Sequence, residues 1–261
     1  MNVYRSLRRI RVAPSAPGRN GRRLAAYVGL ACLLWAVFAW PLSPGVRIAD
    51  FNHTSWDAKD GAPPGVYSIA QTADGFLWLV SSVDKNLYRF DGRRFEVVEL
   101  PRGETSRARE IYKLFAPRSG GLWIGYTFGG ASLFKDGQLT SFSEKEGLPA
   151  GTLKAFAEEP DGTMWAATTR GLARLGARRW ELVSSLEGSS TNPYQMLFDT
   201  QGTLWIGYSE KILYLSRGKS LQGLPGSFEN PSYLVESSSG QMLAGGNDGI
   251  LPLLIRRLLT P

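Results

Sequence analysis

Residues 74–79 read DGFLWL, and versions of this stretch return along the chain at a nearly constant interval. The later versions are GGLWI, DGTMWA, QGTLWI and SGQMLA, at residues 120–124, 161–166, 201–206 and 239–244. At the tryptophan position, the spacings by subtraction are 45, 42, 40 and 38 residues, from Trp78 through Trp123, Trp165 and Trp205 to Leu243. A repeat of this length predicts one supersecondary unit that is copied along the chain.

Each unit holds up to four short apolar runs separated by turn residues. In the first unit the predicted strands are residues 66–71, 76–80, 87–90 and 95–98. Asp-Gly pairs separate some of these runs, and Asp-Gly between apolar runs is a strong hairpin signal because glycine accepts a positive φ. The strands predicted in the later units are 110–115, 122–126, 131–134 and 139–142; 153–157, 164–168, 172–175 and 180–183; 194–198, 204–208 and 212–215, with a faint outer strand near 220–221; and 233–236 and 242–244.

Four strands in about 40 residues, repeated along a chain, are typical of a β-propeller. We therefore expect an all-β fold over residues 50–250, with four four-stranded blades, part of a fifth, and an incomplete ring. A lead-in strand at 51–56 and a Pro/Gly turn at 60–65 are expected before the first blade, and residues 146–149 echo that turn. Because the repeated tryptophans alternate with Leu or Ile, we expect them in cores between blades and not on a sugar-binding surface.

The last residues depart from the repeat. After Gly249 and Ile250, where a third strand is expected, the chain reads LPLLIRRLLTP. Proline lacks the N–H that a strand ladder needs, so Pro252 is expected to interrupt the strand, and residues 251–261 to form an aberrant apolar tail that is too short to cross a membrane. Our hypothesis is a coding sequence that ends early or shifts frame near residue 250. An incomplete ring would expose strand edges and one blade face.

The net charge of +7 comes from the N-terminus. Residues 1–23 contain no acid and seven of the 30 basic residues, which leaves 23 bases (30 − 7) against 23 acids in the rest of the chain. A nucleic-acid-binding surface needs a basic patch, so we expect no nucleic-acid partner and interpret 1–23 as a basic cytoplasmic tail. The seven residues are Arg5, Arg8, Arg9, Arg11, Arg19, Arg22 and Arg23.

Residues 24–40, LAAYVGLACLLWAVFAW, form an uncharged apolar run that Pro41 and Leu42 extend. A run of this length is at the short end of what spans a bilayer as a helix, and the arginines before it place the N-terminus in the cytoplasm. We expect a transmembrane helix or uncleaved signal anchor at 24–42, in the bacterial cytoplasmic membrane, with the propeller in the periplasm. A cleaved signal peptide stays open as the alternative, because Val37 and Ala39 suit a cleavage site.

Residues suited to catalysis or metal binding are sparse. Cys32 is the only cysteine and His53 the only histidine, so the sequence predicts no disulfide, no metal site, no cofactor and no catalytic residue. An enzyme on this fold, such as a glycosidase or a lyase, needs acids that converge in a central pocket. Five scattered acids are the candidates for such chemistry, and they share no position in the repeat: Asp84, Glu110, Glu158, Glu210 and Asp248.

The third unit, DGTMWAATTRGLARL at residues 161–175, resembles the two-component regulator propeller repeat, written as DGxLWIGT followed by GLxR. The first unit resembles it as closely, with QTADGFLWL at 71–79 and LYRFDG at 87–92, and the likeness covers about residues 50–250. The resemblance implies an extracytoplasmic sensor region of a membrane protein. In that family the output domain is most often a histidine kinase, and sometimes a diguanylate cyclase or a DNA-binding regulator.

The family's output motifs do not occur in this sequence: it has no dimerisation helix with a phosphoacceptor histidine, no Gly-rich ATP lid and no cyclase motif. We therefore expect a membrane-anchored periplasmic signal-input propeller that is not itself an enzyme. Its ligand, a small molecule or a glycan, would bind in the central mouth of the propeller, at residues that the sequence does not identify. A homodimer is expected of intact members of the family. An extracytoplasmic enzyme and a passive protein-interaction scaffold remain as alternatives.

Overall fold

The computed structural model describes residues 53–101, 110–186, 192–226, 228, 231, 233–247 and 249–253. The chain divides into two compact units, Met1–Ser55 and Trp56–Pro261, and all but three of the described residues belong to the second. The predicted basic tail at 1–23 and the predicted membrane helix at 24–42 lie outside the described residues. Within the described ranges, no helix is both long and apolar enough to span a bilayer.

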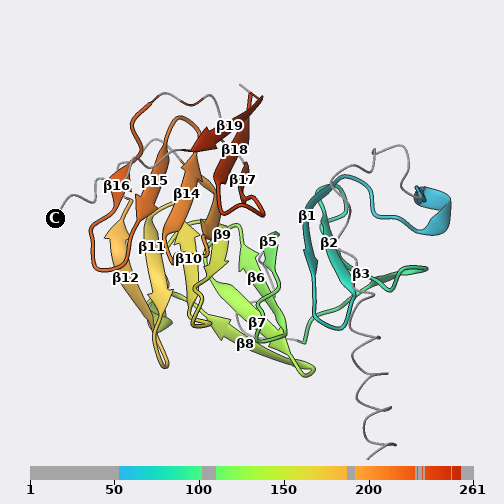
Figure 1. Cartoon of the computed structure of the whole chain (residues 1–261). Helices are drawn as coiled ribbons and strands as arrows, with labels where there is room; N and C mark the ends of the chain where they lie inside the picture. Colours follow the sequence, from blue (N-terminus) through green and yellow to red (C-terminus); the bar gives the residue numbers. More distant parts are fainter. Residues whose placement is uncertain are drawn as a thin grey trace, which may run out of the picture. The chain divides into compact units, whose positions relative to one another are not determined.

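The second unit contains five antiparallel sheets in its described part, and the strands of each sheet follow one another in chain order (Figure 1). The first sheet contains β1 (Val66–Gln71), β2 (Leu77–Ser81), β3 (Leu87–Phe90) and β4 (Phe95–Val97), and the second contains β5 (Ile111–Phe115), β6 (Leu122–Tyr126), β7 (Ala131–Lys135) and β8 (Gln138–Phe142). The third contains β9 (Leu153–Glu158), β10 (Met164–Thr168), β11 (Gly171–Leu175) and β12 (Trp180–Ser185). The fourth contains β13 (Pro193–Phe198), β14 (Leu204–Tyr208), β15 (Ile212–Leu215) and β16 (Gln222–Gly223), and the fifth contains β17 (Tyr233–Glu236), β18 (Met242–Gly246) and β19 (Gly249–Leu253).

These sheets are the blades of a five-blade β-propeller, which confirms the all-β prediction. The repeated tryptophans lie on the second strand of the first four blades and are buried, with 2–6% of their surface exposed. Each packs against the first two strands of the following blade. Trp78 contacts the cluster of Leu122 and Ile124, and Trp205 contacts that of Leu234 and Met242. The predicted role of these tryptophans in the cores between blades is therefore confirmed.

In the first, third and fourth blades, a polar residue six positions before the repeated tryptophan accepts the hydrogen bond of its indole N–H. The indole nitrogens of Trp78, Trp165 and Trp205 donate to Thr72 Oγ1 (3.0 Å), Glu159 Oε2 (3.0 Å) and Asp199 Oδ2 (2.8 Å). Asp199 is buried, and its Oδ1 also accepts the backbone N–H groups of Gln201 and Thr203 at 3.0 and 2.7 Å. The Asp199 carboxylate therefore stabilises the turn at Gly202 and also accepts the buried indole N–H of Trp205. Buried polar groups in folded proteins nearly always have such a partner.

We expect Asp199→Asn to lower the free energy of unfolding by about 1–3 kcal/mol. The asparagine oxygen can still accept the two backbone N–H groups, but its amide nitrogen cannot accept from the indole of Trp205, which is left unpaired in the core. Urea unfolding followed by circular dichroism measures the change. Asp91→Asn is the control, because Asp91 accepts two backbone N–H groups in an exposed turn and no indole. Equal midpoints for the two variants would contradict the role given to Asp199.

The predicted lead-in strand at 51–56 is wrong where the structure describes it, because residues 53–57 form no strand. Asp57 instead begins the short 3-10 helix η3 (Ala58–Asp60), where its side chain accepts from the Lys59 N–H at 2.7 Å and its own N–H donates to Asp60 at 2.9 Å. Such local bonds compete with strand pairing. The 3-10 helix η4 (Glu144–Glu146), which precedes the third blade, has the same capping box and also ends at a left-handed glycine, so the predicted echo is confirmed.

Two predictions at the C-terminal side are also corrected. The outer strand of the fourth blade is β16 at 222–223 and not 220–221. The third strand expected after Gly249 is present as β19 and includes Pro252, which lies opposite Leu243. Within the described residues β19 is an edge strand, where a missing N–H is tolerated. Leu253 is buried in the cluster of Trp205, so residues 251–253 belong to the blade, and 254–261 lie outside the described residues.

Candidate functional site

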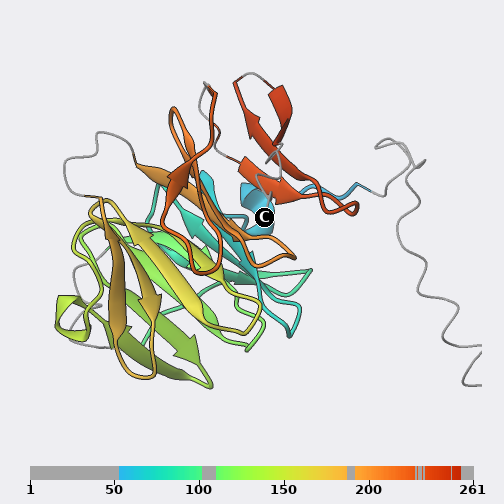
Figure 2. The ribbon, with the colours of Figure 1, turned by 60° about the vertical axis from the view of Figure 1, so that its left-hand side comes forward.

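The first strand of each blade contacts the first strand of the next, in the order β1, β5, β9, β13 and β17. Figure 2 shows the blades in chain order, from the teal first sheet to the red fifth. Side chains of these inner strands also join neighbouring blades. Ser68 Oγ accepts the Leu114 N–H at 2.9 Å, and Gln195 exchanges two hydrogen bonds with the backbone of Leu234, at 2.7 and 3.0 Å. The inner strands therefore form a fixed scaffold on which side chains can be placed.

A β-bulge lies at the same position in the first four inner strands. The register with the second strand skips one residue in each, and these residues are Tyr67, Tyr112, Lys154 and Tyr194. A bulge re-aims a side chain away from the regular alternation of the strand. Tyr67 and Tyr194 are each 40% exposed, and Tyr112 and Lys154 are half-buried. The bulges therefore keep three aromatic side chains and one cation out of the tryptophan cores.

The sequence reasoning missed these residues, although the sequence contains their signal. Each stands 11 residues before the repeated tryptophan of its blade: 78 − 67, 123 − 112, 165 − 154 and 205 − 194 all equal 11. An alignment of the units on the tryptophan shows this column as Tyr, Tyr, Lys and Tyr. A polar column at constant spacing is a candidate binding position, because a column that only fills the core would be apolar.

Tyr67, Tyr112 and Lys154 form a continuous row across the first three blades. The hydroxyl of Tyr67 donates to the carbonyl of Ile111, and the ring centroids of Tyr67 and Tyr112 lie 6.1 Å apart. Lys154 Nζ lies 4.2 Å from the ring centroid of Tyr112 and donates to its hydroxyl at 3.0 Å. Burial, and next the charge of Glu110, raises the pKa of Tyr67 to about 12, so this phenol is a neutral donor at physiological pH.

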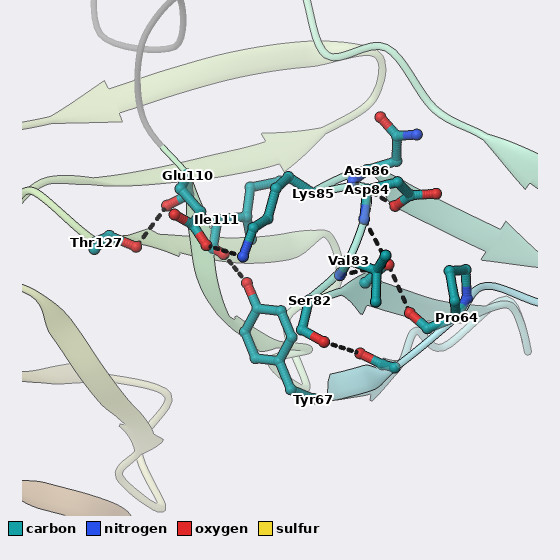
Figure 3. A network of polar contacts seen from close by, with 12 residues as sticks. Pro64, Tyr67, Ser82, Val83, Asp84, Lys85, Asn86, Glu110, Ile111 and Thr127 are labelled. Carbon is teal, nitrogen blue, oxygen red and sulfur yellow. Dashed lines mark hydrogen bonds and ion pairs between the residues drawn. The ribbon is translucent and has the colours of Figure 1, made fainter.

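A polar network fixes the edge of this row between the first two blades (Figure 3). Lys85 Nζ pairs with Glu110 Oε1 at 2.6 Å, and Thr127 donates to the Glu110 carbonyl from its N–H (2.9 Å) and hydroxyl (3.2 Å). Ser82 Oγ donates to the Gly65 carbonyl at 2.8 Å. Figure 3 shows Tyr67 pointing toward Ile111 inside this network. The row is therefore held from one side by bonds that join two blades.

The five candidate acids do not converge. Asp84 and Glu110 belong to the network of Figure 3, where Asp84 accepts from the Tyr88 hydroxyl and the Asn86 N–H, and the Tyr88 bond is the main cause of the lowered pKa of Asp84. Glu158 instead accepts from Arg118, from its backbone N–H at 2.7 Å and from Nε at 3.2 Å. Glu210 lies exposed between β14 and β15, and Asp248 lies outside the described residues. No group of three or more potential metal-binding side chains occurs in the described part of the chain.

Two equivalent grooves lie between blades, at the end of β1 and β9 opposite the bulges. One, of about 530 Å³, is between the first two blades and includes Trp78 and Arg89; the other, of about 380 Å³, is between the third and fourth and includes Trp165 and Arg174. Both grooves are lined by acids as well as bases, whereas Lys154 in the row of Tyr67 and Tyr112 (the tyrosine row) has no acidic partner among the described residues.

Searches against models of protein families and against curated protein sequences find no match. Solved structures do match in fold. The extracellular domain assigned to a hybrid two-component system of B. thetaiotaomicron has a TM-score of 0.60 and 15% sequence identity, over 73% of this chain and 27% of that domain. The chain thus spans about a quarter of that domain.

Two enzymes of similar fold match over most of their length. A catalytically inactive variant of virginiamycin B lyase from Staphylococcus aureus has a TM-score of 0.55 and 14% identity, over 76% of this chain and 71% of that one. A gluconolactonase from Xanthomonas campestris has a TM-score of 0.52 and 16% identity, over 72% of each chain. At these identities the likeness shows the propeller fold alone, and function must be argued from the residues.

Proposed function

We propose that the chain is the signal-input propeller of a sensor that is anchored in the cytoplasmic membrane and faces the periplasm. The observation that carries the proposal is the row of Tyr67, Tyr112 and Lys154. It occupies a repeated position that the blade cores do not use, and its side chains are partly exposed to solvent. The likeness to an extracellular two-component domain, and the DGxLWIGT-type repeats, support the same reading.

The row also offers a way to pass a signal on. Its three side chains come from three successive blades, and its edge is tied to Glu110 and Lys85 across the first two. A ligand that contacts all three would favour one relative packing of these blades over another. Only such differential affinity between two states can shift their populations.

An enzyme is the second candidate, because the lyase and the gluconolactonase match at similar scores and over more of their own length. Such an enzyme would need a pair of acids about 5–9.5 Å apart in one pocket if it cleaved glycosides. Of the candidate acids, only Asp84 and Glu110 share a network, and each is already engaged by a tyrosine or a lysine. The sensor proposal therefore accounts better for the partly exposed row of Tyr67, Tyr112 and Lys154.

We expect bacterial alkaline phosphatase, fused after residue 261 of the full chain, to be active in cells and to sediment with membranes after carbonate washing. The enzyme folds only where disulfides form, outside the cytoplasm. Deleting residues 24–42 is the matched control and should abolish both results. Active phosphatase that is released from membranes would favour the cleaved signal peptide, and inactive phosphatase in the full fusion would refute the periplasmic location.

A further inference from the structure

The charge in the tyrosine row has no counter-ion among the described residues. Lys154 Nζ lies over the ring of Tyr112 and donates to its hydroxyl, and no acid of the described part of the chain lies within ion-pair distance of it. Glu110, whose charge acts on Tyr67 in the same row, already pairs with Lys85 at 2.6 Å. A half-buried cation on an aromatic face that has no acidic partner in the described ranges is a candidate position for an anion.

A second cation follows Tyr112 directly on β5. Lys113 is half-buried, and it has no ion pair in the described part of the chain. Burial lowers its pKa, because the charged form is poorly solvated there. An anion near its ammonium group would offset that penalty. Lys154 therefore favours a negatively charged ligand over a neutral one, and Lys113 adds a second positive charge on the strand of Tyr112.

The tyrosines supply a flat apolar surface next to the charge. The hydroxyl of Tyr67 is used by the Ile111 carbonyl, which leaves the ring faces as the groups of Tyr67 that a ligand can contact. The ring of Tyr112 lies tilted beside it at 6.1 Å, with Lys154 at 4.2 Å from its centroid. A ring held in place in this way loses little conformational entropy when a ligand stacks on it.

We infer that Tyr67, Tyr112 and Lys154 bind a small organic carboxylate that carries a flat ring. The carboxylate would pair with Lys154, and the ring would stack on the tyrosines. This inference rests on the proposed function, for which it names the class of ligand. The inference predicts weaker binding of two simpler classes of ligand. A short carboxylate lacks the ring that stacks on the tyrosines, and an uncharged ring lacks the carboxylate that pairs with Lys154.

Isothermal titration calorimetry on the full chain in detergent micelles tests the inference, with benzoate as the probe and heats from empty micelles subtracted. Acetate, benzyl alcohol and inorganic phosphate are the comparison probes. We expect benzoate to bind with a dissociation constant of about 1 mM or lower, and each comparison probe to bind at least about tenfold more weakly. No benzoate binding up to about 10 mM, or equal binding of acetate, benzyl alcohol or phosphate, overturns the inference.

Three lysine variants locate the site. Lys154→Gln should weaken benzoate binding by about tenfold or more, whereas Lys154→Arg, which keeps the charge, should stay within about threefold. Lys211→Gln is the matched control, because Lys211 also lies over a tyrosine ring, 5.5 Å from the centroid of Tyr208, but not at a bulge. If Lys154→Gln and Lys211→Gln weaken benzoate binding equally, the assignment of the site to Lys154 is wrong.

The two proposals fail separately. If the phosphatase fusion is inactive while benzoate still binds through Lys154, the periplasmic sensor is refuted and the carboxylate site stands. If the fusion is active and benzoate does not bind, the sensor location stands and the ligand class is wrong.

Discussion

Replacing Trp205 with alanine is expected to lower the free energy of unfolding by about 3–5 kcal/mol. The side chain is 2% exposed and packs with Ile212, Leu234 and Met242, so its removal leaves a cavity between the fourth and fifth blades. It also leaves Asp199 Oδ2 without the indole N–H that it accepts at 2.8 Å. Two losses therefore add at one position, the lost packing and an unpaired buried acceptor.

Urea unfolding of the full chain in detergent, followed by circular dichroism, measures this change. Trp56→Ala is the matched control, because Trp56 is 40% exposed and contacts Phe90 only edge-on, with ring centroids 4.9 Å apart. We expect Trp56→Ala to lower the free energy of unfolding much less than Trp205→Ala does. If the two alanine variants unfold at the same urea concentration, the repeated tryptophan does not hold the blades together.

Gly147→Ala is expected to lower the free energy of unfolding by about 2–5 kcal/mol. About 1–2 kcal/mol of this comes from backbone strain and the rest from overpacking. Gly147 caps η4 with a φ of +86°, in the left-handed region that side chains avoid. A Cβ there would lie 2.2 Å from the carbonyl oxygen of Trp180, which is backbone and cannot swing away. Either the turn before the third blade or the start of β12 must then move.

Gly137→Ala separates the two causes. Gly137 also has a positive φ, of +74°, but a Cβ there meets nothing within 4 Å. We expect this variant to show the backbone cost alone, about 1–2 kcal/mol in the same urea titration. A loss for Gly147→Ala no larger than that for Gly137→Ala would show that the contact with Trp180 does not constrain the turn.

The regular part of the fold could be predicted because local and global signals agree there. β1, β3, β6, β10, β14, β15 and β17 have the predicted bounds, which their apolar residues and their places in the repeat indicate. The buried tryptophans followed from their spacing. Strand ends that depend on pairing, such as β16, shifted by about two residues, as element boundaries often do.

The misses share a physical cause, which is that a pairing partner or a short-range polar bond overrode the local pattern. The sequence pattern predicts a break at Pro252, yet proline needs no backbone donor on the edge strand β19. The predicted strand at 51–56 is absent from its described residues 53–56, and the carboxylate of Asp57 that follows accepts the backbone N–H of Lys59. The predictions for residues 1–23 and 24–42 remain predictions.

The candidate site was missed because a bulge cannot be seen in one strand. Period-2 alternation assigns Tyr67 to a face of β1, whereas the register with β2 skips it and turns it out. Only the comparison of four units, aligned on their tryptophans, separates the bulge column from the core columns. Repetition therefore carries information about the site as well as about the fold.

The central claim is that two columns of the repeat have different roles. The tryptophans stabilise the blades, and the bulge residues Tyr67, Tyr112 and Lys154 bind the ligand. The unfolding free energy of Lys154→Gln, measured beside that of Trp205→Ala, tests this division most directly. We expect Lys154→Gln to stay within about 0.5 kcal/mol of the wild-type protein while it weakens benzoate binding. A loss of stability as large as that of Trp205→Ala would contradict the account, because Lys154 would then belong to the architecture and not to a site.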